Sequence, residues 1–194
     1  MKKGTLVLAA LALALATGCK SDKKESKDIE VATPVAPEKE MEVTPKKVKV
    51  VLEQKSESGV SGNAVFTEEN GTVTMVAVLG GLEPGIHAIH LHEKADCSSP
   101  DGKSTGGHWN PQGQPHGKWG AAAGYHKGDI GNFTADENGN GTITFSTDEW
   151  CISCGDENKN ILGKAIIVHQ GTDDFITQPT GDAGGRVSCG GIIE

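Results

Sequence analysis

The sequence predicts an all-β fold, an eight-stranded antiparallel Greek-key barrel or sandwich with long loops between some of its strands. Three observations lead to this prediction. Short segments rich in Val, Ile, Thr and Phe resemble β-strands, and clusters of Gly, Asn, Asp and Pro separate them. No segment has a convincing helical period. The pattern occupies residues 46–194, which we predict to be one folded domain.

Eight segments of this domain fit short strands. In chain order they are 48–52, 62–66, 72–78, 85–93, 129–135, 142–145, 165–169, and 186–189 with the apolar residues 192–193 after it. Between 93 and 127 the chain has no strand pattern and is filled with Gly, Ser, Pro, Asn and His. A loop of that length inside a compact domain is usually functional or held by cross-links.

Residues 1–18 are predicted to be a signal peptide. A basic start is followed by an apolar run over 6–16 that is too short to span a bilayer comfortably. Small residues before Cys19 resemble the lipobox of bacterial lipoproteins, with Ala16 where leucine is usual. We expect Cys19 to be lipidated and to anchor the protein to a membrane of the bacterial cell envelope, facing the periplasm or the exterior. An ordinary cleaved signal is the alternative.

Residues 19–45 are predicted to be a flexible tether between this lipid anchor and the domain. The segment is rich in Lys, Glu, Ser and Pro and has almost no aliphatic pattern. It therefore cannot bury enough apolar surface to offset the entropy of ordering it.

The net charge of −8 argues against a nucleic-acid partner. It also means that an anionic substrate would need a local positive patch on an otherwise acidic protein.

Apart from Cys19, four cysteines remain, and they allow three pairings: Cys97, Cys151, Cys154 and Cys189. In an exported protein, disulfides are the default. Cys151 and Cys154 have the spacing of a thioredoxin-like redox pair but lie in a polar loop without a βαβ setting. A local structural disulfide is the favoured interpretation, with metal binding or free thiols as alternatives.

The seven histidines all lie between His87 and His169. His90 and His92 alternate with apolar residues in the predicted strand 85–93, so both project from one face and can share a metal ion. The other histidines fall at strand ends or in the long loop, where ligands distant in sequence can meet. Three imidazoles with an aspartate suit tetrahedral zinc, and four imidazoles suit tetragonal copper. Two metal sites are thus available if one histidine bridges them.

The chain resembles the copper/zinc superoxide dismutase family over roughly residues 48–193. Four motifs occur in family order: Gly-x-His-x-x-His-x-His at 85–92, Gly-His-x-Asn-Pro at 107–111, His-x-Gly-Asp-x-Gly-Asn at 126–132 and Gly-x-Ala-Gly-x-Arg-x-x-Cys-Gly at 181–190. The resemblance implies an enzyme that disproportionates superoxide to oxygen and hydrogen peroxide, with copper and zinc as cofactors. It would protect the cell envelope from oxidative damage.

The resemblance also implies the ligand sets. The copper ligands would be His90, His92, His108 and His169. The zinc ligands would be His108, His116, His126 and Asp129. His108 would then be an imidazolate bridge, and by taking up a proton on its copper side it would also serve catalysis. His87 resembles the family's structural histidine, which hydrogen-bonds to backbone instead of metal.

An aspartate outside these sets would link the two sites. Asp173 matches the family residue that connects a copper histidine, here His90, to a zinc histidine, here His116. Such partners fix ring tautomers and orient the ligands. Asp174 is adjacent, so the choice between the two aspartates rests on the family register.

Further correspondences concern the disulfide and the substrate. Cys97 and Cys189 match the disulfide that ties the long loop to the last strand, and Arg186 matches the arginine beside the copper. The loop 173–185 is short and carries no lysine, unlike that of eukaryotic members. Any further attraction for superoxide would come from lysines elsewhere, such as those at 94, 118 and 127.

The loop lengths resemble those of the bacterial branch, which leaves the assembly open between a monomer and a homodimer. The alternative function is a non-catalytic copper or zinc carrier descended from the enzyme. Loss of a copper ligand or of Arg186 would favour that alternative, and all of these residues are present.

Overall fold

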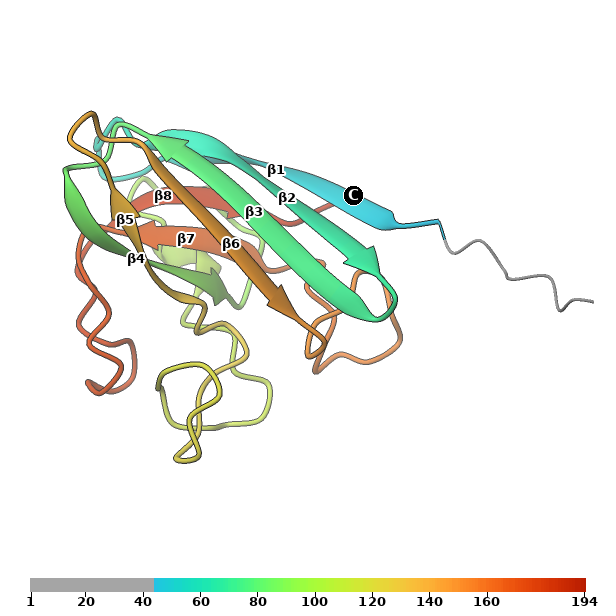
Figure 1. Ribbon diagram of the computed structural model, residues 1–194. Helices are drawn as coiled ribbons and strands as arrows, with labels where there is room; N and C mark the ends of the chain where they lie inside the picture. The colour runs from blue at the N-terminus through green and yellow to red at the C-terminus, as the bar shows by residue number, and fades with distance from the viewer. Residues whose placement is uncertain (1–43) are drawn as a thin grey trace, which may run out of the picture. The chain divides into compact units, whose positions relative to one another are not determined.

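The computed structural model describes residues 44–194, which form a closed antiparallel barrel (Figure 1). Its strands are β1 (Lys46–Gln54), β2 (Ser61–Glu69), β3 (Thr72–Gly80), β4 (Gly85–His92), β5 (Gly131–Ala135), β6 (Gly141–Thr147), β7 (Ala165–His169) and β8 (Arg186–Gly191). The one helix among these residues is a 3-10 turn, η1 (Lys103–Thr105). The predicted all-β, eight-stranded architecture is confirmed. The predicted signal peptide, Cys19 and all but the end of the predicted tether lie outside the described residues.

The order of strands around the barrel is β1-β2-β3-β6-β5-β4-β7-β8. Because β3 pairs with β6, and β4 pairs with β7, two connections skip their sequence neighbours as in a Greek key. Within residues 44–194 no helix is long and apolar enough to cross a membrane.

Strands β1 and β3 alternate buried and exposed residues, as expected of a half-buried sheet. In β1, Val48, Val50 and Leu52 point inward between exposed residues. In β3, alternate residues from Val73 to Leu79 do the same. Each fully buried Val, Leu or Met side chain of this set contributes roughly 1.5–3 kcal/mol relative to an exposed one. The register of these strands is thereby fixed, because a slip of one residue would expose the whole apolar set.

Strands β4 and β7 are buried on both faces. Ile89 and Leu91 of β4 point into the barrel, whereas His90 and His92 point outward and are nevertheless fully buried. The cover comes from the two long connections, 93–130 and 170–185, which extend from the same side of the barrel (Figure 1). The outer face of β4 and β7 is therefore the floor of an enclosed polar site.

Close backbone contact holds the long loop against β4. Gly128 accepts a hydrogen bond from the Leu91 amide at 2.9 Å, and its own amide donates to the Trp109 carbonyl. A Cβ added at Gly128 would lie 2.2 Å from the Leu91 carbonyl oxygen, a clash that only glycine avoids. This close approach explains the glycine between His126 and Asp129.

Candidate metal centre

Four buried histidines meet on the outer face of the barrel. His90 and His92 come from β4, His169 ends β7, and His108 lies in the long loop, where its backbone forms a β-bridge with His92. One side-chain nitrogen of each lies within 4.8 Å of the other three. A register shift between Val168 and His169 places His169 opposite Arg186 of β8.

A second group adjoins the first. It consists of His108, His116, His126 and Asp129, whose ligand atoms also lie within 4.8 Å of one another. The Asp129 carboxylate lies 2.8 Å from Nδ1 of His108, 3.0 Å from Nδ1 of His116 and 3.2 Å from Nδ1 of His126. The contacts of His116 and His126 do not have hydrogen-bond geometry, so their Nδ1 atoms are left without a partner.

His108 is the one residue common to both groups. Its Nδ1 faces Asp129, and its Nε2 is buried without a hydrogen-bond partner among the described residues. The His108 ring is centred 4.0 Å from the His90 ring and 5.6 Å from the His126 ring. Its two nitrogens therefore face the two sites, as a bridging imidazole requires.

Carbonyl groups orient two of the rings. His92 Nδ1 donates to the Gly106 carbonyl at 3.0 Å, and His169 Nδ1 donates to the Gly184 carbonyl at 3.3 Å. Because a carbonyl only accepts, each Nδ1 carries the proton and each Nε2 keeps its lone pair. Both Nε2 atoms are buried without a partner in residues 44–194, and they are the atoms that point into the four-histidine group.

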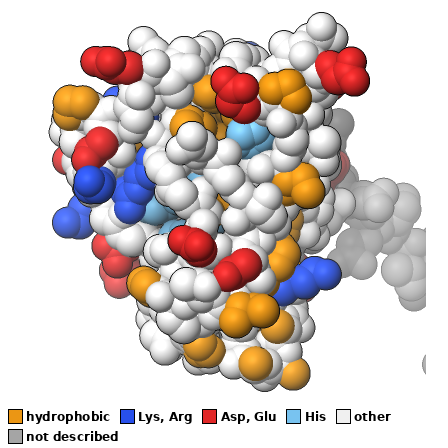
Figure 2. All heavy atoms as spheres, turned by 90° about the vertical axis from the view of Figure 1, so that its left-hand side faces the viewer, with side chains coloured by type: hydrophobic (Ala, Val, Ile, Leu, Met, Phe, Trp, Pro, Cys, Tyr) orange, Lys and Arg blue, Asp and Glu red, His pale blue; other side chains and the backbone are white. Residues whose placement is uncertain are grey.

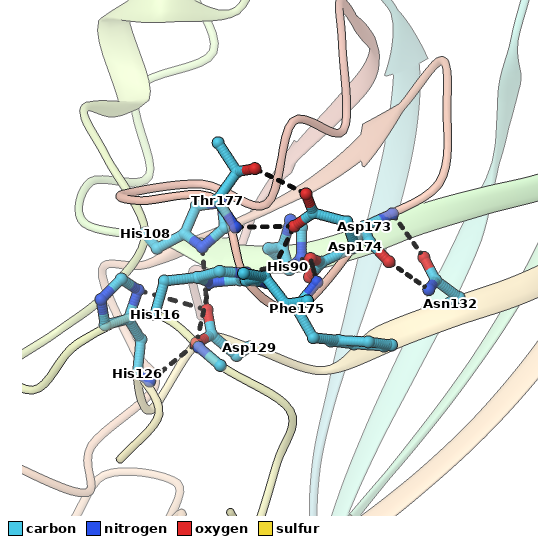
Figure 3. Close-up of polar contacts among 12 residues, drawn as sticks. His90, His108, His116, His126, Asp129, Asn132, Asp173, Asp174, Phe175 and Thr177 are labelled. Carbon is cyan, nitrogen blue, oxygen red and sulfur yellow. Dashed lines mark hydrogen bonds and ion pairs between the residues drawn. The ribbon is translucent and has the colours of Figure 1, made fainter. Parts of the chain in front are cut away.

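Asp173 connects the two groups (Figure 3). Its carboxylate accepts hydrogen bonds from His90 Nε2 and from His116 Nε2, each at 2.9 Å. Asn132 fixes the Asp173 backbone by bonding to both its amide and its carbonyl. Asp174 instead bonds to the amides of the next turn of its own loop. Of the two adjacent aspartates, Asp173 is the one that contacts the histidines.

His87 lies close by but is not available to a metal. Its Nδ1 lies 3.0 Å from the carbonyl oxygen of His169, and its Nε2 lies 2.7 Å from that of Glu83. Both ring nitrogens thus contact backbone, as expected for a structural histidine.

The protonation states differ within the site. Burial lowers the pKa of His108 to about 4, with the nearby His90 adding to the effect. Burial also lowers the pKa values of His92 and His169. For His116, burial acts in the same direction, but contacts with the Asp129 and Asp173 carboxylates outweigh it and raise the pKa to about 9.

The donor set fits two metal ions. Six buried nitrogen atoms of the described residues lack a hydrogen-bond partner, an arrangement that is costly unless something else binds them: His90 Nδ1, His92 Nε2, His108 Nε2, His116 Nδ1, His126 Nδ1 and His169 Nε2. Burial raises the Asp129 pKa, but the close contacts with the three histidines, among them the His108 hydrogen bond, outweigh burial and hold this pKa far below its usual value, so the carboxylate is ionised. Three imidazoles and a carboxylate match zinc, and four imidazoles match copper.

A cavity of about 330 Å³ opens beside the four-histidine group. Its lining includes His169, Arg186, Thr180 and Lys103. The Arg186 guanidinium donates to the carbonyls of Gly102 and Gly106 and to the Thr105 hydroxyl, at 2.8–3.0 Å. It has five N–H donors, so two remain without a partner in residues 44–194. Figure 2 shows Lys and Arg side chains gathered beside exposed histidine atoms on one face.

The sequence does not mark Lys103 as a residue of this cavity, and the lysines at 94, 118 and 127 do not line it. Lys127, for example, forms an ion pair with Glu149. Lys103 sits in η1, six residues after Cys97, and the disulfide between Cys97 and Cys189 ties this part of the loop to β8, the strand that carries Arg186. The disulfide alone would not have identified this lysine, because Lys94 lies closer to Cys97 in the sequence and does not line the cavity.

Residues 44–194 contain two disulfides. Cys97 bonds to Cys189, and Cys151 bonds to Cys154 within a single loop. Neither cysteine pair takes part in the histidine groups. The local structural disulfide favoured for Cys151 and Cys154 is therefore present.

A closed antiparallel barrel carries two adjoining groups of buried ligand-type side chains that share one imidazole, and each group could hold a metal ion. Comparison with known proteins gives the family: residues 60–192 match the model of copper/zinc superoxide dismutase, and the chain belongs to that family.

Solved structures agree with the family assignment. A double mutant of a SOD-like protein from Bacillus subtilis is 30% identical, with a TM-score of 0.68 over 75% of this chain and 97% of that one. The unmutated SOD-like protein from Bacillus subtilis is 29% identical, with a TM-score of 0.67 over the same shares. The clock protein EA4 is 36% identical, with a TM-score of 0.66 over 78% of this chain and 97% of that one.

Proposed function

We propose that this protein is a superoxide dismutase that binds copper and zinc. Copper would be held by the four-histidine group of β4, β7 and the long loop, and zinc by the group that contains Asp129. The observation that carries the proposal is the position of His108, whose two ring nitrogens face the two groups. The cavity lined by His169 and Arg186 opens beside the four-histidine group.

The reaction requires electrons and protons. Two superoxide anions and two protons give one oxygen molecule and one hydrogen peroxide. Copper, when bound, supplies the change between two oxidation states that this exchange of one electron needs, and zinc cannot supply it. The protein residues have to bind the anion, place it and deliver the protons.

Arg186 is the residue that would bind the anion. Its guanidinium is fixed by three hydrogen bonds to the loop around η1 and keeps two N–H donors in a planar arrangement suited to a small anion. The Gly106 carbonyl accepts hydrogen bonds from both Arg186 and His92, so one backbone group orients both the guanidinium and a copper-side histidine.

His108 is the residue that would hold a proton next to the anion. Its Nε2 is buried and can take up or release a proton, while its Nδ1 faces the group that contains the ionised Asp129. The cavity reaches His169, whose ring centre lies 6.1 Å from that of His108, so an anion bound there would lie near this histidine.

Lys103 would add to the attraction for superoxide. It lines the same cavity and is exposed, but its ammonium lies 2.9 Å from the Asp101 carboxylate. The carboxylate cancels part of the positive charge, and at physiological ionic strength solvent ions screen what remains beyond about 8 Å.

We further propose that the enzyme works in the bacterial cell envelope, attached through a lipid on Cys19. The motif before Cys19 and the disulfides, which are typical of oxidising compartments, support this location. Cys19→Ser should release the protein from membranes, and unchanged partitioning would contradict lipidation.

The experiment that tests the enzyme proposal combines metal analysis with a superoxide-consumption assay. The purified protein should take up one copper and one zinc. His169→Ala should lose copper and activity but keep zinc, because His169 lies outside the zinc group. Stoichiometric zinc without copper uptake or activity would instead favour a metal carrier, and retained dismutation by His169→Ala would refute the copper assignment.

A further inference from the structure

The side chain of Gln178 forms two hydrogen bonds to the backbone of His116. Its Oε1 accepts from the His116 amide at 2.8 Å, and its Nε2 donates to the His116 carbonyl at 2.8 Å. One primary amide thus pairs with both main-chain groups of a single residue, as a neighbouring strand would. Gln178 comes from the loop after β7, and His116 from the long loop before β5.

His116 has no regular structure to hold its backbone. It lies in the irregular stretch between η1 and β5, and residues 111–115 before it are all exposed. The other members of the Asp129 group are supported locally. His108 pairs with His92 in a β-bridge, and His126 and Asp129 bond to each other within one turn. Only His116 depends on a side chain from another loop for both of its main-chain bonds.

The same loop also contacts the His116 ring. Asp173 accepts from its Nε2, and Gly181 packs against that contact. A Cβ at Gly181 would lie 1.9 Å from the Asp173 carboxylate and 2.7 Å from His116 Nε2, and the positive φ of 70° there favours glycine as well. Asp173 fixes the far side of the ring, and Gln178 fixes the backbone from which the ring projects. With both in place, Nδ1 can point only toward Asp129.

We propose that Gln178 is a positioning residue for the zinc ligand His116, so that zinc affinity depends on a side chain that never contacts the metal. This inference rests on the zinc site of the proposed function. Partners that orient a metal-bound histidine typically contribute about 10-fold to 100-fold in affinity. Since Gln178 acts on the backbone instead of the ring, we expect Gln178→Ala to weaken zinc binding by about 10-fold.

The test measures zinc binding to the metal-free, full-length protein by competition with a chromophoric chelator. Gln178→Ala removes both hydrogen bonds to His116 and also a longer one, at 3.3 Å, from Nε2 to the Ile176 carbonyl of its own loop. Gln178→Glu keeps the size and one acceptor, but its second oxygen cannot donate to the His116 carbonyl, so affinity should fall here too. Gln112→Ala is the matched control, because Gln112 is an exposed glutamine of the loop that carries His116, and its side chain has no hydrogen bond to any described residue.

Two further readouts separate positioning from general loosening of the loop. Copper affinity should stay within about twofold of the wild type in both Gln178 variants, because no copper-side histidine contacts Gln178. Cobalt bound in place of zinc should show an altered visible spectrum, which reports the geometry of its ligands. The Gln112 variant should match the wild type in all three measurements.

The outcomes distinguish this inference from the proposed function. If the wild type binds one zinc and both Gln178 variants bind it equally well, the inference is wrong and the enzyme proposal stands. If the variants lose copper and zinc to the same extent, Gln178 maintains the loop as a whole, and a specific role toward His116 is refuted. If the wild type binds no zinc, the proposed function fails, and this inference fails with it.

Discussion

Replacing Asp173 by asparagine changes one atom and should disable the copper side of the site. The Asp173 Oδ1 accepts from His116 Nε2 at 2.9 Å and from the Phe175 amide at 2.7 Å, whereas Oδ2 accepts only from His90 Nε2. An asparagine would keep its oxygen toward the two donors at Oδ1. Its NH₂ group would then face the Nε2–H of His90, and because both groups are donors, no hydrogen bond could form between them.

The conflict has two resolutions, and both weaken copper binding. His90 could move its proton from Nε2 to Nδ1, which is the nitrogen facing the other copper-side histidines. Alternatively, its Nε2–H could stay buried without an acceptor. A hydrogen bond to a charged group is worth about 1.5–3 kcal/mol, which corresponds to about 10-fold to 100-fold in affinity.

The assay is a titration of metal-free Asp173→Asn with copper in the presence of a competing chelator, followed by superoxide consumption. Asp174→Asn is the control, since Asp174 is the same residue type one position further on and bonds to Ile176 and Thr177 instead of the histidines. It should bind copper like the wild type. Equal copper affinity in the wild type and Asp173→Asn would refute the reasoning about the His90 proton.

Three other predictions concern charge, pH and cross-links. Lys103→Ala should slow dismutation by a few-fold, and Asp101→Asn, which frees Lys103 from its ion pair, should speed it. A steering role would be contradicted if the stopped-flow rates of the two variants did not change in opposite directions, or if these rates did not depend on salt concentration. Zinc binding should tighten by about tenfold per pH unit from about 6.5 up to about 9, because His116 must lose its proton to bind; calorimetry showing a flat affinity would refute this. Cys189→Ser opens a disulfide between residues 92 apart and should lower the free energy of unfolding, measured in urea, by about 4–5 kcal/mol. Cys154→Ser opens a disulfide between residues 3 apart and should lower it by about 2 kcal/mol. Equal losses in the two variants would show that loop length does not set the stabilisation.

The parts of the site that lie on strands could be predicted from residue pattern. The alternation in β4 places His90 and His92 on one face whatever the details of the barrel, because side chains on a strand have a period of two. The pairing of these histidines with loop residues rested on family motifs instead. No local rule says that the His108 backbone should bridge to His92.

Contacts between irregular loops could not be predicted. Gln178 and His116 are 62 positions apart in segments without periodicity, and nothing local in the sequence marks the pair. The choice between Asp173 and Asp174 depends on backbone direction at one residue of a turn. Lys103 lies at the cavity only because the chain folds back from Cys97 to Cys189.

Superoxide dismutase activity is tested by following the decay of superoxide by stopped-flow absorbance. The protein loaded with copper and zinc is compared with the protein loaded with zinc alone. The proposed function predicts that the fully loaded protein removes a large excess of superoxide over many turnovers. One oxygen and one hydrogen peroxide should form for every two anions consumed, and Arg186→Ala should be slower than the wild type. Decay no faster than with the zinc-only protein, at full copper occupancy, would contradict it.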